Sequence, residues 1–218
     1  MRKFLLLIII AGVFYSIKAQ TTSLPGSSDT IYCFDPIVNY YRVESNKEVR
    51  KDSLINTKNG NCLKEGFKYY FNQITNTKFL DINLKKDSCA LKELNVLFIF
   101  LDHKSLKEVP RMSCMDIILD SIHTGYALIS VSQGFVRSKE DYNKAMRKGV
   151  LLSALTLGSY VSIPNESAID LRIILMNVKT RQLITYKGCK MIECAPDSQK
   201  DINTQVMRIF KSTFKKKK

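Results

Sequence analysis

Cysteines and histidines are the residues of this chain that most often carry chemistry. The two histidines, His103 and His123, stand in neither the HExxH spacing of a zinc protease nor a Cys-x-x-Cys-His run. There is no Gly-x-Ser-x-Gly elbow, no Walker loop and no GxGxxG turn, and no carboxylate pair has a spacing typical of acid–base work. The residues therefore predict no catalytic site, no cofactor and no metal ion. A Cys–His site assembled from distant residues is the alternative, because such partners meet in space and not in sequence.

The chain has an even number of cysteines, which permits up to three disulfides in an oxidising compartment. They are Cys33, Cys62, Cys89, Cys114, Cys189 and Cys194. We expect a disulfide between Cys189 and Cys194, because they flank a short loop and a bridge there needs little rearrangement. Their spacing is wider than the Cys-x₂-Cys of a zinc half-site, and no second half-site is evident.

Residues 1–19 have the layout of a secretory signal peptide. Arg2 and Lys3 precede an apolar run, and the small residue Ala19 ends the segment. The run is shorter than the roughly 18–20 residues that span a bilayer, so cleavage after about Ala19 is favoured over a permanent anchor. No cysteine lies near this point, which predicts that the protein is not a lipoprotein. Residues 20–30 are small and polar and predict a flexible leader.

The chain is strongly basic, with a formal net charge of +14. Residues 1–19 hold three basic and no acidic residues, which leaves +11 for the exported part. In an exported protein this charge attracts anionic lipids or acidic glycans, and export argues against nucleic acid as a partner. Spread lysines are also typical of an ordinary solvated surface. The exception is a terminal basic tail, residues 215–218, which consists of Lys215, Lys216, Lys217 and Lys218.

The first half of the chain predicts a mixture of strands and helices. Residues 31–43 read as a strand that Pro36 confines to an edge or breaks in two. Asn61 is a candidate cap for a helix. Its apolar stripe would comprise Leu63, Phe67, Tyr70, Phe71 and Ile74. The run 91–101 is apolar on every side, and its β-branched and aromatic content favours a buried strand over a buried helix.

The second half shows clearer periodicity. A helix is expected at 112–122, and residues 126–135 alternate in the manner of a half-buried strand. A β-hairpin is expected at about 168–188, and Ser198 is placed to cap a C-terminal amphipathic helix. The expected fold is α+β, a single mixed sheet with flanking helices, in one domain over 31–214.

An insertion, residues 136–167, separates two of these strands. A connection of this length without secondary structure of its own is uncommon, so we expect the insertion to form secondary structure or to have a functional role. The insertion begins with basic residues and continues with apolar ones. This pattern is typical of a helix or hairpin that covers a sheet. It is also typical of a segment that docks on a membrane or packs against a second copy of the chain. The candidate contact residues are Arg147, Lys148, Leu151, Leu152, Leu155, Leu157 and Tyr160, together with the basic tail.

Several motifs at the start of this insertion and within it resemble a group of uncharacterised exported proteins of Gram-negative bacteria. They are GFVRSK at 134–139, KG at 148–149, TLGSY at 156–160, and Pro164. More distantly, the arrangement is similar to envelope lipoproteins related to the curli-secretion lipoprotein and to the amino-terminal domain of TolB-like proteins. The resemblance implies a periplasmic or outer-envelope module that assembles or binds, with no active site to transfer.

The sequence thus predicts an exported, non-enzymatic binding or assembly protein. Its expected partners are an anionic membrane surface, an envelope polymer, an envelope protein, or itself in a homo-oligomer. A secreted hydrolase or thiol enzyme is the alternative.

Overall fold

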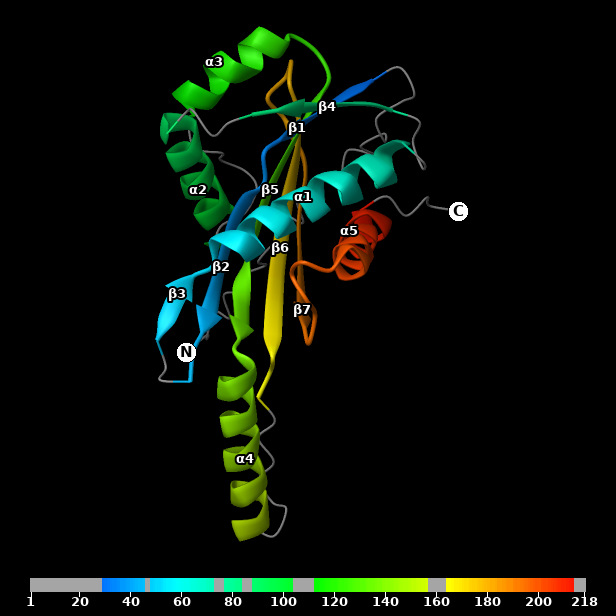
Figure 1. The fold of residues 1–218 in the computed structure, drawn as a ribbon. Coiled ribbons are helices and arrows are strands. Elements are labelled where there is room, and N and C mark those ends of the chain that lie inside the picture. The colour runs from blue at the N-terminus through cyan, green and yellow to red at the C-terminus, as the bar shows by residue number, and fades with distance from the viewer. Residues whose placement is uncertain are drawn as a thin grey trace, which may run out of the picture.

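The computed structural model describes residues 29–45, 48–72, 77–83, 88–103, 112–156 and 164–213. In that part of the chain, seven strands form one mixed sheet that is accompanied by five helices (Figure 1). The strands are β1 (Thr30–Phe34), β2 (Ile37–Val43), β3 (Val49–Lys51), β4 (Lys78–Ile82), β5 (Tyr126–Arg137), β6 (Ser167–Asn177) and β7 (Leu183–Ile192). The helices are α1 (Ser53–Tyr70), α2 (Ser88–His103), α3 (Ser113–Ile122), α4 (Lys139–Leu155) and α5 (Gln199–Thr213). The α+β prediction is confirmed, whereas the signal peptide and the basic tail lie outside the described residues.

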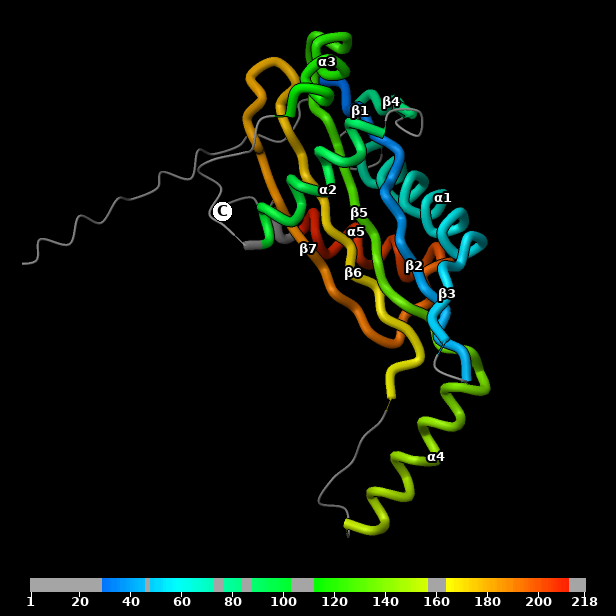
Figure 2. Tube along the Cα trace, turned by 90° about the vertical axis from the view of Figure 1, so that its left-hand side faces the viewer, coloured from blue at the N-terminus to red at the C-terminus, as the bar shows by residue number. Residues whose placement is uncertain are grey.

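The long strand β5 lies at the centre of the sheet. On one side it pairs antiparallel with β6, and β7 continues the sheet beyond β6 (Figure 2). On its other side it pairs parallel with β1 along its first residues and with β2 along its last. Asp35 and Pro36 separate β1 from β2, because proline has no N–H to donate to a ladder. Pro36 therefore breaks the predicted strand in two.

One face of the sheet is covered by α1 and α5 (Figure 1). Phe67, Tyr70 and Phe71 of the predicted stripe are buried there, and Phe210 of α5 packs against all three. Ile74 lies outside the described residues. The helix begins earlier than expected, since the Asp52 side chain accepts a hydrogen bond from Ile55 N at 2.9 Å and caps α1. Asn61 is therefore an interior residue and not the cap.

The opposite face is covered in part by α2 and α3. The prediction of a strand at 91–101 is wrong, because this segment forms most of α2. Leu97 and Leu101 are buried against the sheet, whereas Val96 and Ile99 are exposed. Because the exposed side of this helix is also apolar, the sequence lacks the periodic change between apolar and polar residues that distinguishes a helix from a strand. The helix predicted at 112–122 is confirmed as α3.

The C-terminal elements follow the sequence pattern closely. The predicted hairpin is formed by β6 and β7, and β7 runs on to Ile192. Asn177 Oδ1 accepts a hydrogen bond from Thr180 N at 2.9 Å within the connecting turn. Ser198 Oγ accepts one from Asp201 N at 3.3 Å and so caps α5 as expected.

The insertion contains α4, which projects away from the sheet beyond the end of β5 (Figure 1, Figure 2). Because β5 extends to Arg137, the insertion begins within a strand and changes to helix at Ser138. Ser138 Oγ accepts a hydrogen bond from Asp141 N at 3.1 Å, which caps the new helix. The helix extends outward and does not cover the sheet.

Candidate functional site

The face that α2 and α3 cover has two parts of different composition. Its covered half consists of apolar residues beneath these helices, namely Ala127, Ile129, Val131, Ile174 and Met176. Further along the same strands lies an open half, over which Figure 2 shows no described helix. A groove of about 1060 Å³ occupies this open half, lined by β2, β3, β5, β6 and β7. Strand register places its side chains in two rows that cross the sheet.

One row of the open half is apolar. Strand register sets Tyr41 beside Phe135, Phe135 beside Ala168, and Ala168 beside Ile192. Tyr41 is 43% exposed and Ile192 is 61% exposed. The Arg137 guanidinium lies 5.6 Å from the centre of the Phe135 ring, at the edge of the row. The row therefore presents an aromatic and aliphatic strip to solvent.

The neighbouring row is polar. Register places Asn39, Gln133, Asp170 and Lys190 side by side on four adjacent strands. Gln133 Nε2 lies 3.5 Å from Asp170 Oδ2, and the Arg172 guanidinium donates to the same carboxylate at 2.7 Å. These contacts fix part of the row in one arrangement.

The end of α2 contacts Arg172, one of the residues that line the groove. Asp102, near the C-terminus of α2, forms an ion pair with Arg172 and accepts a hydrogen bond from the Tyr186 hydroxyl. Arg172 thus bridges Asp102 and Asp170, with its side chain only 22% exposed. This bridge marks the line at which the covered half ends and the open half begins.

The second candidate contact region is α4. Val150, Leu151, Leu152 and Leu155 are exposed near its outer end, with exposed fractions that reach 72% at Leu155. Of the predicted contact residues, Arg147 and Lys148 are exposed and directly precede this apolar end. Leu157, Tyr160 and the lysines 215–218 lie outside the described residues. In the described part of the chain, no helix is both long and apolar enough to cross a membrane.

The junction between β5 and α4 is held by specific contacts. Arg137 forms an ion pair with Asp141 at 2.5 Å and donates to the Asn165 carbonyl at 3.0 Å. A Cβ on Gly134 would lie 1.9 Å from the Ala168 carbonyl oxygen, so only glycine fits there. The GFVRSK motif therefore coincides with the strand-to-helix junction.

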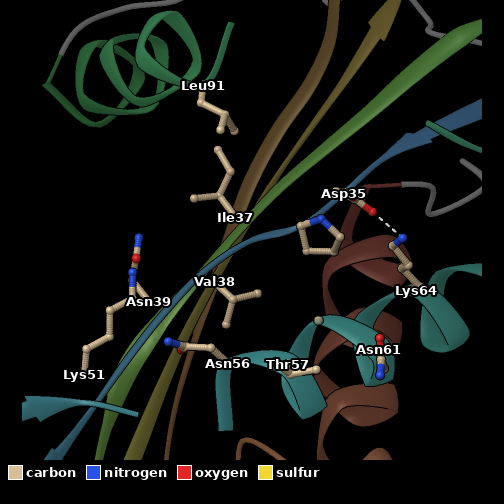
Figure 3. A pocket seen from close by; sticks show the side chains of 12 residues that line it. Asp35, Ile37, Val38, Asn39, Lys51, Asn56, Thr57, Asn61, Lys64 and Leu91 are labelled. Carbon is tan, nitrogen blue, oxygen red and sulfur yellow. Dashed lines mark ion pairs between the residues drawn. The ribbon is translucent and has the colours of Figure 1, made fainter. Parts of the chain in front are cut away.

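A smaller cleft of about 400 Å³ lies between β2 and α1. Figure 3 shows Lys64 reaching across it to form an ion pair with Asp35. Burial acts to lower the pKa of Lys64, but the hydrogen bond to Asp35 raises it above its ordinary value. Asn56 Oδ1 accepts from Tyr40 N at 2.7 Å along the edge of β2. These polar groups hold α1 against the sheet, so this cleft reads as structural.

The cysteines do not pair as the sequence suggested. The disulfide joins Cys89 of α2 to Cys114 of α3, whereas Cys189 and Cys194 are both unbonded. Residues 189–192 are extended strand, so Cys189 and Cys194 do not flank a short loop as the prediction assumed. No local sequence pattern marks the observed pair, because the Cys89–Cys114 bond depends on how two helices approach each other.

The unbonded thiols are poorly suited to nucleophilic chemistry. Burial raises the pKa of Cys33, Cys62, Cys189 and Cys194 above the ordinary thiol value. Because the thiolate is the reactive form, a raised pKa reduces reactivity at neutral pH. None of the four therefore resembles an activated nucleophile.

One group of potential metal ligands occurs among the described residues. Ligand atoms of Cys89, Glu93 and Cys114 lie within 4.8 Å of one another. Both sulfurs are used by the disulfide, and the Glu93 carboxylate accepts hydrogen bonds from Cys114 N and Met115 N at the start of α3. In this structure, the disulfide and the hydrogen bonds of Glu93 therefore make this cluster a link between α2 and α3.

No protein-family model and no curated protein matches this chain. Solved structures similar to it include the LpoB C-terminal domain from Salmonella enterica, with 12% identity, a TM-score of 0.33 and coverage of 78% of this chain and 85% of that one. A DUF330 protein from Xanthomonas campestris has 7% identity, a TM-score of 0.34 and coverages of 84% and 80%. A Helicobacter pylori protein described as a neuraminyllactose-binding hemagglutinin homologue has 10% identity, a TM-score of 0.34 and coverages of 89% and 86%. Similarities at this level assign neither a family nor a function.

Proposed function

We propose that this protein is an exported, non-enzymatic binding module of the bacterial envelope that docks on anionic membrane surfaces through α4. The observation that carries the proposal is the exposed apolar end of this projecting helix, directly preceded by basic residues. The Cys89–Cys114 disulfide supports export, because disulfides form and persist in oxidising compartments. The raised pKa values of the thiols give no support to the alternative of a thiol enzyme.

The apolar outer end of α4, here called the tip, is suited to insertion into a membrane surface. Val150, Leu151 and Leu152 are consecutive, so their side chains point about 100° apart around the helix axis. The helix end therefore has no single apolar face to lay against the parent sheet. Full burial of one leucine stabilises by about 1.5–3 kcal/mol, so even partial immersion of several side chains gives useful affinity.

Basic residues adjoin this apolar end. Lys144, Arg147 and Lys148 are exposed, and residues 142–156 contain no acidic side chain. Each lysine or arginine close to an anionic leaflet contributes about 1 kcal/mol, and salt screens the attraction. An apolar tip with adjacent cations therefore favours anionic over neutral lipid.

Flotation with lipid vesicles tests the proposal. The protein recovered after export is mixed with phosphatidylcholine vesicles that contain or lack phosphatidylglycerol. A double variant, Leu151→Ser with Leu155→Ser, should bind phosphatidylglycerol vesicles at least about tenfold more weakly than the parent. The matched control is Leu54→Ser with Ile117→Ser, because these residues lie elsewhere and have the same exposed fractions, 62% and 72%.

Two outcomes would overturn the membrane proposal. One is a parent protein that does not float with phosphatidylglycerol vesicles, and the other is a tip variant that floats as well as the control. If the parent protein does not float but forms a dimer that the tip variant loses, α4 is assigned to packing between two copies. Light scattering after size-exclusion chromatography distinguishes that case.

The basic tail, residues 215–218, is proposed as an auxiliary electrostatic contact. Deletion of the four lysines should weaken binding to phosphatidylglycerol vesicles at low salt and have little effect at high salt. Unchanged binding at low salt would remove the tail from the proposal and leave α4 as the contact.

A further inference from the structure

We propose that the open half of the sheet face is a second ligand site, separate from α4, which binds a chain of acidic sugars. The groove of about 1060 Å³ is long enough to cross several strands, and its two rows of side chains differ in chemistry. Composition, row spacing and charge each bear on the nature of the ligand.

The composition of the strands changes where the cover ends. Along β5, Ala127, Ile129 and Val131 lie under α2, and the next two residues on that side are Gln133 and Phe135. On β6 the same change runs from Ile174 to Arg172 and Asp170. A second apolar helix laid on the open half would bury these polar groups, and each one left unpaired would cost about 1–3 kcal/mol. The polar side chains of the open half therefore favour a polar ligand over an apolar helix.

A sugar chain matches both rows at once. Residues on one side of a strand repeat every second position, so the polar and apolar rows are about 7 Å apart, a distance that a single sugar unit can span. A pyranose ring has an apolar face of C–H groups and a rim of hydroxyls. Tyr41 and Phe135 would take the C–H face, and the amides of Asn39 and Gln133 would meet hydroxyls.

The charges around the groove favour an acidic sugar. Arg172 pairs with both Asp170 and Asp102, so these three groups together carry one net negative charge, which the two positive charges of Lys190 and Lys51 outweigh. Lys190 ends the polar row, and Lys51 lies opposite Tyr41 in register at the border with the smaller cleft. Neither is in an ion pair with another described residue. Asn39 lines both the groove and the smaller cleft, and Lys51 lines the latter with it (Figure 3). Two lysines without ion-pair partners thus lie beside the apolar row.

Binding of the recovered protein to immobilised hyaluronate, polygalacturonate and polysialate, with dextran as a neutral probe, tests this site. At least one acidic polymer should bind and dextran should not. Tyr41→Ala should weaken binding about tenfold, and Lys190→Gln about threefold with the loss vanishing at high salt. Tyr69→Ala is the matched control, because Tyr69 is a similarly exposed tyrosine on α1. Asn39→Ala provides a second variant should Tyr41→Ala fail to fold.

The proposal fails if no acidic polymer binds, or if dextran binds as tightly as the acidic polymers. It also fails if Tyr41→Ala, or Asn39→Ala in its place, binds as the parent does, since the attraction would then come from overall charge. The α4 double variant should bind the polymer normally, which separates failure of this site from failure of the membrane proposal.

Discussion

The covered and open halves of one sheet face are built from the same strands but have opposite chemistry. Under α2, the residues facing outward from β5 and β6 are apolar and buried, and Leu94 and Leu97 of α2 pack in the same cluster. Beyond Asp102, the corresponding positions hold an amide, an aromatic ring and an ion-paired carboxylate. The comparison teaches that the cover, formed by α2 and α3, ends where the side chains on this face change from apolar to polar. The sequences of the strands therefore already determine which half of the face stays exposed. The following predictions test that difference, beginning with the largest expected effect.

Truncation of the cover should destabilise the protein strongly. Leu97→Ala removes a fully buried side chain from the covered half, and we expect a loss of about 4 kcal/mol in the free energy of unfolding. Ile99→Ala, on the exposed side of the same helix, should cost less than about 0.5 kcal/mol. Urea unfolding of both variants measures the difference. Equal losses would mean that α2 is not packed as described.

The disulfide should hold the cover together. Replacement of Cys89 and Cys114 by serine releases a link across 25 residues, and we expect a loss of about 3 kcal/mol. A reducing agent should destabilise the parent protein by a similar amount and leave the double variant unchanged. A variant as stable as the parent in non-reducing buffer would show that the link does not stabilise the α2–α3 pair.

The open half is supported from behind by the start of α1, and this support should depend on pH. Burial acts to raise the pKa of Asp52, but hydrogen bonds from Ile55 N and Arg42 lower it below the ordinary carboxyl value. A lowered pKa in the folded state means that Asp52 stabilises fully above the unfolded pKa and loses this contribution as the pH falls through the folded one.

Substitution of Asp52 makes this contribution measurable. Asp52→Ala should cost about 1 kcal/mol at neutral pH, chiefly through loss of the helix cap. The gap between the parent and the variant should narrow in acid, below the ordinary carboxyl pKa. Unfolding at several pH values records it, and a gap that stays constant in acid would contradict the role of the carboxylate.

Truncation within the open half should have the smallest effect on stability. Tyr41→Ala removes an exposed ring with no cover, so we expect a change within about 0.5 kcal/mol. Thermal unfolding provides the measurement. A loss as large as that of Leu97→Ala would erase the distinction between the two halves.

Sequence patterns correctly predicted the helices and strands that have one apolar face and one polar face. The hairpin, the C-terminal helix and the Ser198 cap were all found where periodicity placed them. The start of α1 was missed because Asn59 and Gly60 are typical loop residues, which placed the predicted helix start at Asn61. In the structure, Asn59 is a buried helical residue that donates a hydrogen bond to the Pro196 carbonyl at 2.7 Å. A contact with a residue so distant in sequence has no local signature.

The candidate sites divide in the same way. The apolar and basic segment of α4 was visible as a run of residues, although not its outward direction. The open half was not visible, since it depends on the register of four strands and on where α2 ends. Its members were individually unremarkable polar and aromatic residues within predicted strands. The Cys89–Cys114 pair escaped for a similar reason, because it joins two separate helices.

The attachment of α4 to β5 has a mechanical consequence. β5 is the strand that α4 directly continues, and it is hydrogen-bonded along its length to β6 on one side and to β1 and β2 on the other. A pull on α4 along the direction of β5 would load these ladders in shear, so that many hydrogen bonds share the force. A pull across the sheet at β7 would instead separate pairs one after another. A molecule tethered by the end of α4 would therefore resist tension well.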